Sequence, residues 1–369
     1  MKSVDRLMEK GLLENVFPGA VILGSLNGEV LFLKSYGQAD IFSKREMTLE
    51  TVFDLASLTK PLATALAVMK LVQTGALDPD QKLGDILPPF KLTDKRDIVI
   101  RQLLNHTSGI VDYVPYYQTI YPVAEGKRFS EAKTKLRELL LKTPLSHPPG
   151  KIMLYSDPGF MILNWVVERL SGKGLDRYLN ETIYGPLGLS GESGLFFVDL
   201  NGRPVIKQFA ATENCPWRGV VVSGAVHDEN AYAVGGIEGH AGLFGSVFSV
   251  YRLLWALMQA YHEGDDSEIF QRDLVRLFLT RDEKIGRALG FDAPARSDSS
   301  AGKYFSSESV GHLGFTGTSF WMDLKKKIIV VLLTNRIHPS RANVRIREFR
   351  PRIHDRVMEE LAKAQRIVE

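Results

Sequence analysis

The strongest constraint on the fold is that strand-forming segments lie near both ends of the 369-residue chain. Residues 18–37 contain two β-type runs around Asn27-Gly28, a dipeptide that favours a two-residue hairpin turn. Residues 318–336 contain two further runs around a charged turn. An amphipathic helix is predicted before the first pair, and apolar residues recur at helical spacing after the second pair. The economical arrangement is one mostly antiparallel sheet built from both chain ends, with the terminal helices covering one face.

The middle of the chain, residues 56–290, shows helical periodicity interrupted by long loops rich in Gly, Pro and Tyr. It contains no repeat, no low-complexity linker and no heptad pattern. We therefore predict a single domain over 1–369, of the mixed α/β (α+β) class. Its sheet region, 1–55 and 291–369, would carry an inserted all-helical lobe, and a cleft is expected where the two meet.

Composition argues against several classes of function. With 46 Lys and Arg against 43 Asp and Glu, the chain has no net field that indicates a nucleic-acid partner. The arginine-rich residues 340–356 are expected to form a helix-flanking surface paired with Glu348 and Asp355. Cys215 is the single cysteine, which excludes an internal disulfide and a cysteine-rich metal site, so it is expected to be a small buried hydrophobe.

The sequence contains no predicted membrane segment. Acidic residues interrupt the first sixteen residues, MKSVDRLMEKGLLENV, where a secretory signal would carry an unbroken apolar core. The longest strongly apolar run, residues 328–333, is far too short to span a bilayer. We expect a cytoplasmic protein with no membrane partner, unless a leader peptide was removed.

Residues 56–75, ASLTKPLATALAVMKLVQTG, place a serine and a lysine three residues apart at the start of an apolar helix. At about 100° per residue, Ser57 and Lys60 share one side of that helix, whereas Lys70 has a solvent face. A lysine desolvated there loses affinity for its proton and could accept the proton of the serine. The pattern is common by chance, and a solvated or snorkelling lysine is the alternative.

Two later segments carry residues of matching chemistry. Residues 155–164 place Tyr155 and Asp157 just before a predicted helix, where Asp157 suits an N-cap. Residues 311–323 place His312 and several glycines at the edge of a predicted strand. Glycine there lets a substrate approach the strand backbone, whose free N–H groups can bind an oxyanion.

Together these segments resemble the three motifs of the serine β-lactamase and penicillin-binding protein superfamily, most closely its class C branch with esterase and peptidase relatives. The matching residues are Ser57-Leu58-Thr59-Lys60, Tyr155-Ser156-Asp157 and His312-Leu313-Gly314. The phrases RQLLNHTSGI and VHDENAYAVGGIEGHAGLFGSV match as well, and the resemblance runs from about residue 18 to residue 352.

The resemblance implies Ser57 as nucleophile and Lys60 with Tyr155 as the proton-transfer pair, without a metal or an organic cofactor. A tyrosine beside a cationic lysine should have its pKa lowered by that charge, which would make it a usable base. The N–H groups of Ser57 and Phe315 would form the oxyanion hole. The residues expected on the oxyanion and substrate side are Phe315, His312, Gly314 and Asp157.

The chain departs from the family pattern at two places. Asp157 replaces the usual asparagine, and His312-Leu313 replace a lysine and a threonine. Losing that lysine removes a positive charge that helps dock the carboxylate of penicillin-like substrates, so efficient β-lactam hydrolysis is not expected. The hypothesis is a serine hydrolase that forms an acyl-enzyme on Ser57 and hydrolyses small ester or amide substrates. The alternatives are a D-amino-acid peptidase or muropeptide amidase, and a penicillin-binding sensor module.

Other candidate sites are weaker. Residues 227–229 (HDE) and 238–240 (EGH) fit no zinc spacing, so hydrogen-bonded structural histidines are expected instead of a metal site. Residues 235–245 are glycine-dense but lack the phosphate-loop pattern. The tyrosine-rich residues 111–122 are expected to be a loop that walls the substrate side. His106 is expected to support a turn.

Overall fold

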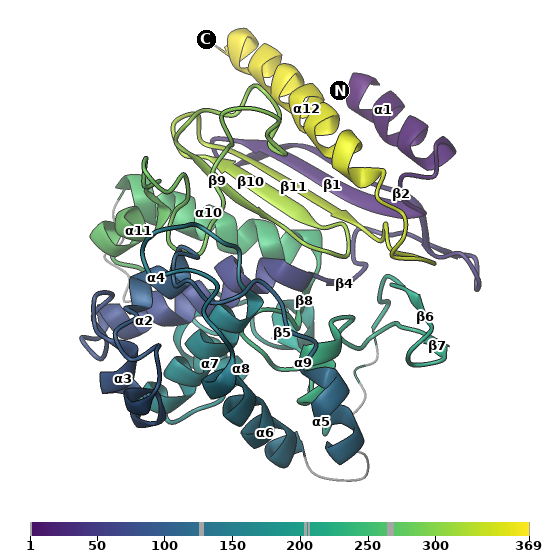
Figure 1. Ribbon diagram of the computed structural model, residues 1–369. Helices are drawn as coiled ribbons and strands as arrows, with labels where there is room; N and C mark the ends of the chain where they lie inside the picture. Colours follow the sequence, from purple (N-terminus) through teal and green to yellow (C-terminus); the bar gives the residue numbers. More distant parts are fainter. Residues whose placement is uncertain (1, 125–128, 203–204, 206, 264–268, 369) are drawn as a thin grey trace.

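The computed structural model describes residues 2–124, 129–202, 205, 207–263 and 269–368. Within these residues, the framework is one antiparallel sheet of six strands in the order β3-β2-β1-β11-β10-β9 (Figure 1). The strands are β1 (Gly19–Leu26), β2 (Glu29–Asp40), β3 (Arg45–Glu46), β9 (Ser309–Leu313), β10 (Ser319–Asp323) and β11 (Ile328–Thr334). Because β1 pairs with β11, the prediction of one sheet built from both chain ends is confirmed.

The β1–β2 hairpin turns where its sequence predicts. Asn27 and Gly28 both have positive φ, 49° and 85°, as the type I′ turn of a tight hairpin requires. A Cβ on Gly28 would also lie 2.5 Å from the Trp255 ring, so glycine is needed there for space as well.

Helices cover both faces of the sheet. The terminal helices α1 (Lys2–Leu13) and α12 (Ile346–Val368) lie together on one face, as predicted (Figure 1). Helix α10 (Val247–Glu263) packs on the other face, against β1 and β11. All of β11 is therefore buried, which explains its uninterrupted apolar run. No helix in the described part of the chain is both long enough and apolar enough to cross a membrane.

The inserted lobe is mainly helical. Its other helices are α2 (Leu66–Gln73), α3 (Leu83–Ile86), α4 (Ile100–Leu104), α5 (Tyr117–Ala124), α6 (Phe129–Lys142), α7 (Asp157–Ser171), α8 (Leu175–Leu179), α9 (Glu229–Ala233) and α11 (Arg272–Leu279). Short 3₁₀ segments span Pro88–Leu92 and Gly191–Ser193, and a π-helical segment spans Asn180–Tyr184.

The prediction of an all-helical lobe is wrong. Strands β4 (Phe53–Asp54), β8 (Leu243–Gly245) and β5 (Leu195–Phe197) form a small sheet, and β6 (Asn214–Cys215) pairs with β7 (Val220–Val221). Strands of two or three residues are too short to show an alternating pattern in the sequence. Their pairing depends on tertiary contacts, such as the Phe196 and Phe244 rings 6.1 Å apart.

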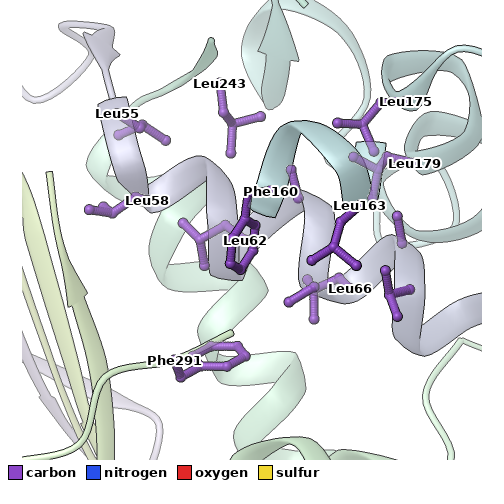
Figure 2. Packing of buried hydrophobic residues seen from close by; sticks show 14 of the residues in the cluster. Leu55, Leu58, Leu62, Leu66, Phe160, Leu163, Leu175, Leu179, Leu243 and Phe291 are labelled. Carbon is purple, nitrogen blue, oxygen red and sulfur yellow. The ribbon is translucent and has the colours of Figure 1, made fainter. Parts of the chain in front are cut away.

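The helix that follows Ser57 runs through the core of the lobe. Leu58, Leu62 and Leu66 are completely buried along it. Figure 2 shows them surrounded by side chains from several other elements of the chain, namely Phe160, Leu163, Leu175, Leu179, Leu243 and Phe291. The serine therefore adjoins a segment whose leucine side chains are completely buried.

Candidate active site

Ser57 lies in an irregular turn rather than in a regular α-helix. It belongs to a 3₁₀ turn, Ala56–Leu58, which is followed by a π-helical segment, Lys60–Ala65, and only then by α2. Ala56 has a positive φ of 49°, and its N–H donates to Asp54 Oδ1 at 2.9 Å. The sequence predicted a helix start here, and the irregularity arises because side-chain hydrogen bonds compete with helical ones. Such irregular segments often occur at functional sites.

Lys60, the predicted partner of Ser57, has no exposed side-chain surface, whereas Lys70 is partly exposed, as the helical spacing predicted. Lys60 Nζ donates to Ser57 Oγ at 3.2 Å and to the main-chain oxygen of His240 at 3.0 Å. It also forms an ion pair with Asp157 Oδ1 at 2.7 Å. An ammonium group has three N–H donors, and the oxygens around Lys60 Nζ give each of them an acceptor.

The ionisation of Lys60 differs from the sequence-based prediction. Burial alone lowers the pKa of Lys60, but the negative charge of Asp157 and the contact with Tyr155 outweigh burial, so the pKa ends above its ordinary value. Lys60 is therefore an ammonium at neutral pH. The expectation that desolvation would free its proton is wrong because a carboxylate, not an amide, stands at position 157.

Tyr155 lies directly beside this ion pair. Lys60 Nζ is 4.9 Å from the centre of the tyrosine ring, and hydrogen bonding to Lys60 and Ser57 acts on its phenol. Burial raises the pKa of Tyr155 by more than the charge of Lys60 lowers it, so the pKa is above its ordinary value. The predicted lowering is wrong in net direction, although the effect of the lysine has the predicted sign.

Asp157 does not cap α7. Ser156 is the N-cap, and its Oγ accepts a hydrogen bond from the N–H of Gly159 at 3.2 Å. Asp157 is the first residue of the helix, and its carboxylate is directed to Lys60. The capping prediction is therefore wrong by one residue, and this shift is what makes Asp157 a partner of the lysine.

The third motif lies at the end of β9, the edge strand of the large sheet. A Cβ on Gly314 would lie 2.7 Å from the main-chain oxygen of Leu55 and 2.0 Å from Thr318 Oγ1, so the close approach requires glycine. Thr316 Oγ1 donates to the main-chain oxygen of Asp54 at 2.8 Å, and Thr318 Oγ1 donates to that of Leu55 at 3.0 Å. These contacts hold the loop after β9 against the turn that carries Ser57.

Two backbone N–H groups at this junction have no acceptor in the part of the chain that the structure describes. The N–H of Ala56 donates to Asp54 Oδ1, and the N–H of Leu58 donates to the main-chain oxygen of Leu55. Between them, the N–H of Ser57 has no acceptor among the described residues. The Phe315 N–H is likewise without an acceptor among the described residues. These are the two groups predicted to bind an oxyanion, and that role stays a prediction.

His312 is uncharged at neutral pH. It is buried, and burial lowers its pKa to about 4. Its Nδ1 donates to the main-chain oxygen of Leu313 at 2.9 Å, and its ring lies 6.0 Å from that of Tyr155. The position therefore supplies no positive charge where the family pattern has lysine.

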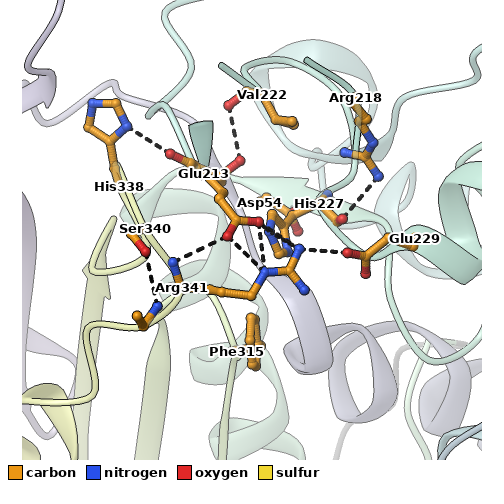
Figure 3. A network of polar contacts seen from close by, with 12 residues as sticks. Asp54, Glu213, Arg218, Val222, His227, Glu229, Phe315, His338, Ser340 and Arg341 are labelled. Atoms are coloured by element: carbon orange, nitrogen blue, oxygen red, sulfur yellow. Dashed lines mark hydrogen bonds and ion pairs between the residues drawn. The ribbon is translucent and has the colours of Figure 1, made fainter. Parts of the chain in front are cut away.

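A polar network lies beside the ring of Phe315 (Figure 3). Arg341 forms ion pairs with Glu213 and Glu229, each at 2.6 Å. The His227 ring stacks on Phe315 with ring centres 5.7 Å apart. The main-chain N–H of His227 donates to Asp54 Oδ2 at 2.7 Å. The network thus links the loop after β9 to the segment that precedes Ser57.

The arginine-rich stretch has partners other than those predicted. Arg341 pairs with Glu213 and Glu229 instead of Glu348 or Asp355. Arg350 is buried, and its Nη2 donates to the main-chain oxygens of Gly314 and Thr318 at 3.1 and 3.0 Å. These partners are far away in the sequence, so charge spacing along the stretch could not identify them.

The other histidines of interest are paired with carboxylates. His227 Nε2 contacts Glu213 at 3.0 Å, and His240 Nε2 contacts Asp228 Oδ1 at 2.9 Å. Burial lowers the pKa of His240, but the charge of Asp228 outweighs it, so the pKa is raised. Among the described residues, no three His, Cys, Asp or Glu side chains form a group that could hold a metal ion.

A cluster of aromatic side chains, here called the aromatic patch, consists of Tyr117, Tyr121, Trp217 and Tyr232. The ring of Trp217 lies 5.1, 4.9 and 5.8 Å from those of Tyr117, Tyr121 and Tyr232. Arg218 lies 4.0 Å above the Tyr232 ring, and 37% of Trp217 stays exposed. The predicted loop 111–122 is partly helical because α5 begins at Tyr117. Sequence analysis missed Trp217, which lies about a hundred residues from the tyrosines of α5.

An antiparallel sheet covered by helices on both faces, with a serine and a buried lysine held against its edge strand, defines the class of serine β-lactamases and penicillin-binding proteins. Sequence comparison agrees with this structural class. The chain belongs to the Beta-lactamase family, whose family model matches residues 4–350.

Individual relatives cover most of the chain. A protein of Escherichia coli strain K12 named "Putative D-alanyl-D-alanine carboxypeptidase" is 31% identical, with coverage of 91% of this chain and 83% of that protein. The "N-acetylmuramyl-L-alanine amidase" of Bacillus subtilis strain 168 is 32% identical, with coverage of 92% and 81%. The structure of "EstCE1, a hydrolase with promiscuous acyltransferase activity" superposes with a TM-score of 0.72 at 22% identity, covering 95% of this chain and 98% of that one.

Proposed function

We propose that the protein is a serine hydrolase that forms an acyl-enzyme on Ser57 and then hydrolyses it. The observation that carries the proposal is the contact of 3.2 Å between Ser57 Oγ and Lys60 Nζ, with the lysine buried and paired to Asp157. A lysine with only a structural role would not need a partly exposed serine among its partners. Membership of the Beta-lactamase family supports the same chemistry.

The proton of Ser57 passes to the Lys60–Tyr155 pair. In the free protein both members of the pair hold their protons at neutral pH, since the pKa of each is raised. The pair must therefore lose one proton before it can act as a base, and the rate should rise with pH. Once Ser57 Oγ attacks the carbonyl carbon, the pair returns the proton to the leaving alcohol or amine.

The negative charge that develops on the carbonyl oxygen would be stabilised by the N–H groups of Ser57 and Phe315. One such donor is worth roughly 10²–10³ in rate. A water molecule then attacks the acyl carbon and gives a proton to the same pair. The pair passes this proton to Ser57 Oγ as the acyl–Oγ bond breaks, and the acyl group leaves as the carboxylic acid. Each step balances without a metal or an organic cofactor.

For the substrate, we propose an amide bond in a peptide or amino-sugar fragment of the bacterial cell wall. The names of the two relatives at 31% and 32% identity, a carboxypeptidase and an amidase, support this class. Neutral His312 speaks against tight binding of a penicillin-like carboxylate. A cytoplasmic location, which suits recycled fragments better than intact cell wall, stays a prediction that fractionation of native cells would test.

The first test follows intact-protein mass over time for the native protein and Ser57→Ala. The acyl donors are nitrophenyl butyrate, benzylpenicillin, and cell-wall amides cleaved at the muramyl or D-alanyl position. We expect a transient adduct on the native protein, continued product release, and neither in Ser57→Ala. Turnover in Ser57→Ala would contradict the proposal. A lasting penicillin adduct without turnover would indicate the sensor module instead.

A further inference from the structure

His106 contacts Tyr155 and both of its chain neighbours. Its main-chain oxygen accepts a hydrogen bond from the N–H of Leu154 at 2.9 Å, and its Nδ1 accepts one from the N–H of Ser156 at 3.0 Å. Its ring packs on the Tyr155 ring, with centres 4.5 Å apart and planes inclined by 31°. One residue therefore fixes the backbone before and after Tyr155 as well as its ring.

The backbone of His106 is held in an uncommon conformation. Its φ is 61°, in the left-handed region that residues other than glycine rarely adopt. Such a conformation costs free energy and persists where the surroundings enforce it, often at functional sites. Here Asn105 Oδ1 accepts hydrogen bonds from both the N–H and the Oγ1 of Thr107, and the Thr107 oxygen accepts one from the N–H of Gly150.

The protonation state of His106 suits this contact. Because Nδ1 accepts a backbone N–H, the ring proton of a neutral imidazole must be on Nε2. Burial, together with the positive charges of Arg287 and Lys60, holds the pKa of His106 well below its ordinary value. The lone pair on Nδ1 is therefore available to Ser156 throughout the neutral range.

The ring of His106 contacts two aromatic rings. Phe160 of α7 lies on it with ring centres 5.1 Å apart, in addition to Tyr155 at 4.5 Å. Phe160 also lies 5.7 Å from Lys60 Nζ. The stack thus connects the rigid helix α7 to the tyrosine and confines the tyrosine ring beside the lysine.

We infer that His106 is a positioning residue for Tyr155, which keeps the phenol within reach of Ser57 and Lys60. The inference rests on the proposed function, in which Tyr155 belongs to the proton-transfer pair. It goes beyond support of a turn, because turn support needs the backbone contacts of His106 but neither its Nδ1 nor its ring. Misplacement of a catalytic group by about 1 Å can cost roughly 10² in rate.

Two substitutions separate the contacts of His106. His106→Asn keeps an acceptor in place of Nδ1 and tolerates positive φ, but removes the ring. His106→Phe keeps a ring and removes the acceptor. Each is made alone and together with Tyr155→Phe. With nitrophenyl butyrate, kcat and KM are measured from nitrophenol release, and the rate of Ser57 acylation is measured by intact mass. His354→Asn is the matched control, at a buried histidine of α12 whose Nδ1 contacts the main-chain oxygen of Ser300 in a turn.

We expect each His106 variant to lower kcat by about fivefold or more with KM within about threefold, because the phenol is displaced while the substrate site is unchanged. In the Tyr155→Phe background the same substitutions should change the acylation rate by less than about twofold, because the group they position is gone. His354→Asn should lower the melting temperature without this coupling.

Two outcomes would overturn the inference while the acyl-enzyme on Ser57 still forms. One is an unchanged kcat in both His106 variants. The other is an equal loss of rate with and without the Tyr155 hydroxyl, which would mark a general structural role. Activity that survives Ser57→Ala would instead contradict the proposed function, so the two failures are distinguishable. Melting temperatures measured for every variant separate loss of rate from loss of fold.

Discussion

At the scale of single residues, Asp157 decides the charge state of the site. An asparagine at this position would leave the buried lysine without an anionic partner, and burial would then lower the pKa of Lys60. The carboxylate, 2.7 Å from Nζ, reverses that effect. Aspartate in place of asparagine at position 157 therefore stabilises the charged form of Lys60 in the free protein. Lys60 can then accept a proton from Ser57 only at higher pH.

Asp157→Asn should shift the acid limb of the pH dependence of kcat/KM to lower pH, because the pKa of Lys60 falls once the negative charge is removed. The free energy of unfolding at pH 7 should also fall, with about 3–5 kcal/mol as an upper bound because Lys60 can release its proton. Asp112→Asn is the control, since the exposed Asp112 side chain accepts from the N–H of Tyr113. An unmoved acid limb would show that Lys60 ionisation does not limit the reaction.

At the scale of secondary-structure elements, the loop after β9 is held from two sides. Thr316 and Thr318 bind the segment that precedes Ser57, and Arg350 of α12 binds the loop oxygens of Gly314 and Thr318. The C-terminal helix thus stabilises the loop that carries the N–H of Phe315. Two of these contacts come from the guanidinium of Arg350, which is buried, although the sequence predicted a surface position for it.

Arg350→Met should lower kcat by about tenfold or more, because two loop oxygens lose their donor and the Phe315 N–H is displaced. The free energy of unfolding should fall by about 1–3 kcal/mol. Arg356→Met is the matched control on the same helix, since the partly exposed Arg356 pairs with Glu359 of α12. Equal kinetics for the two variants would exclude a contribution of α12 to the site.

The aromatic patch, built from several elements, is a candidate surface for substrate contact. The backbone of Asp112 accepts from the N–H of Asp157 at 2.9 Å, and the N–H of Tyr117, five residues later, donates to Asn230 Oδ1 at 2.9 Å. A short segment therefore connects the site to the patch. Large aromatic surfaces with polar edges suit rings of a bulky substrate.

Trp217→Ala should raise KM for a bulky cell-wall amide by about tenfold, equivalent to about 1.4 kcal/mol, because the exposed ring would be lost as a contact. The kinetics with nitrophenyl butyrate should stay within about twofold. Phe248→Ala removes another exposed ring and provides the control. A loss that is equal for both substrates would argue against a role of the patch in specificity.

At the scale of the whole molecule, buried histidines contribute to the response to acid. His106, His312 and His354 are each at most 1% exposed, and burial is the largest cause that lowers their pKa values, to about 4 for the last two. Unfolding exposes them to water, where a histidine has a pKa near 6.5. The unfolded chain therefore binds more protons than the folded protein below that pH.

The free energy of unfolding should decrease as pH falls from about 6.5 to 5, with a slope for each of these three histidines that approaches about 1.4 kcal/mol per pH unit at the lower end. His240 acts in the opposite direction, because its pKa is raised and its contribution is lost as pH rises. Urea unfolding at several pH values measures the slope. His354→Asn should reduce the slope by one histidine's share, and an unchanged slope would contradict this account.

Sequence patterns predicted the sheet built from both chain ends and the hairpin at Asn27-Gly28, and the family resemblance predicted the residues that meet at the site. Hydrophobic period and turn chemistry are local properties, and the motif residues stand at spacings that the sequence displays directly. The cap at Ser156 and the 3₁₀ and π segments were not predictable, because they depend on which side-chain oxygens reach which N–H groups.

The charge states at the site depend on contacts between segments that are distant in the sequence. Whether Lys60 holds its proton depends on the balance between burial and a carboxylate nearly a hundred residues away, which is a difference of two large opposing effects. Three other features also join distant segments: the hydrogen bonds of Arg350, the ring contacts of the aromatic patch, and the contact of His106 with Tyr155. Residue types follow from the sequence, whereas distances and burial, which set pKa values and orientation, exist only in the folded chain.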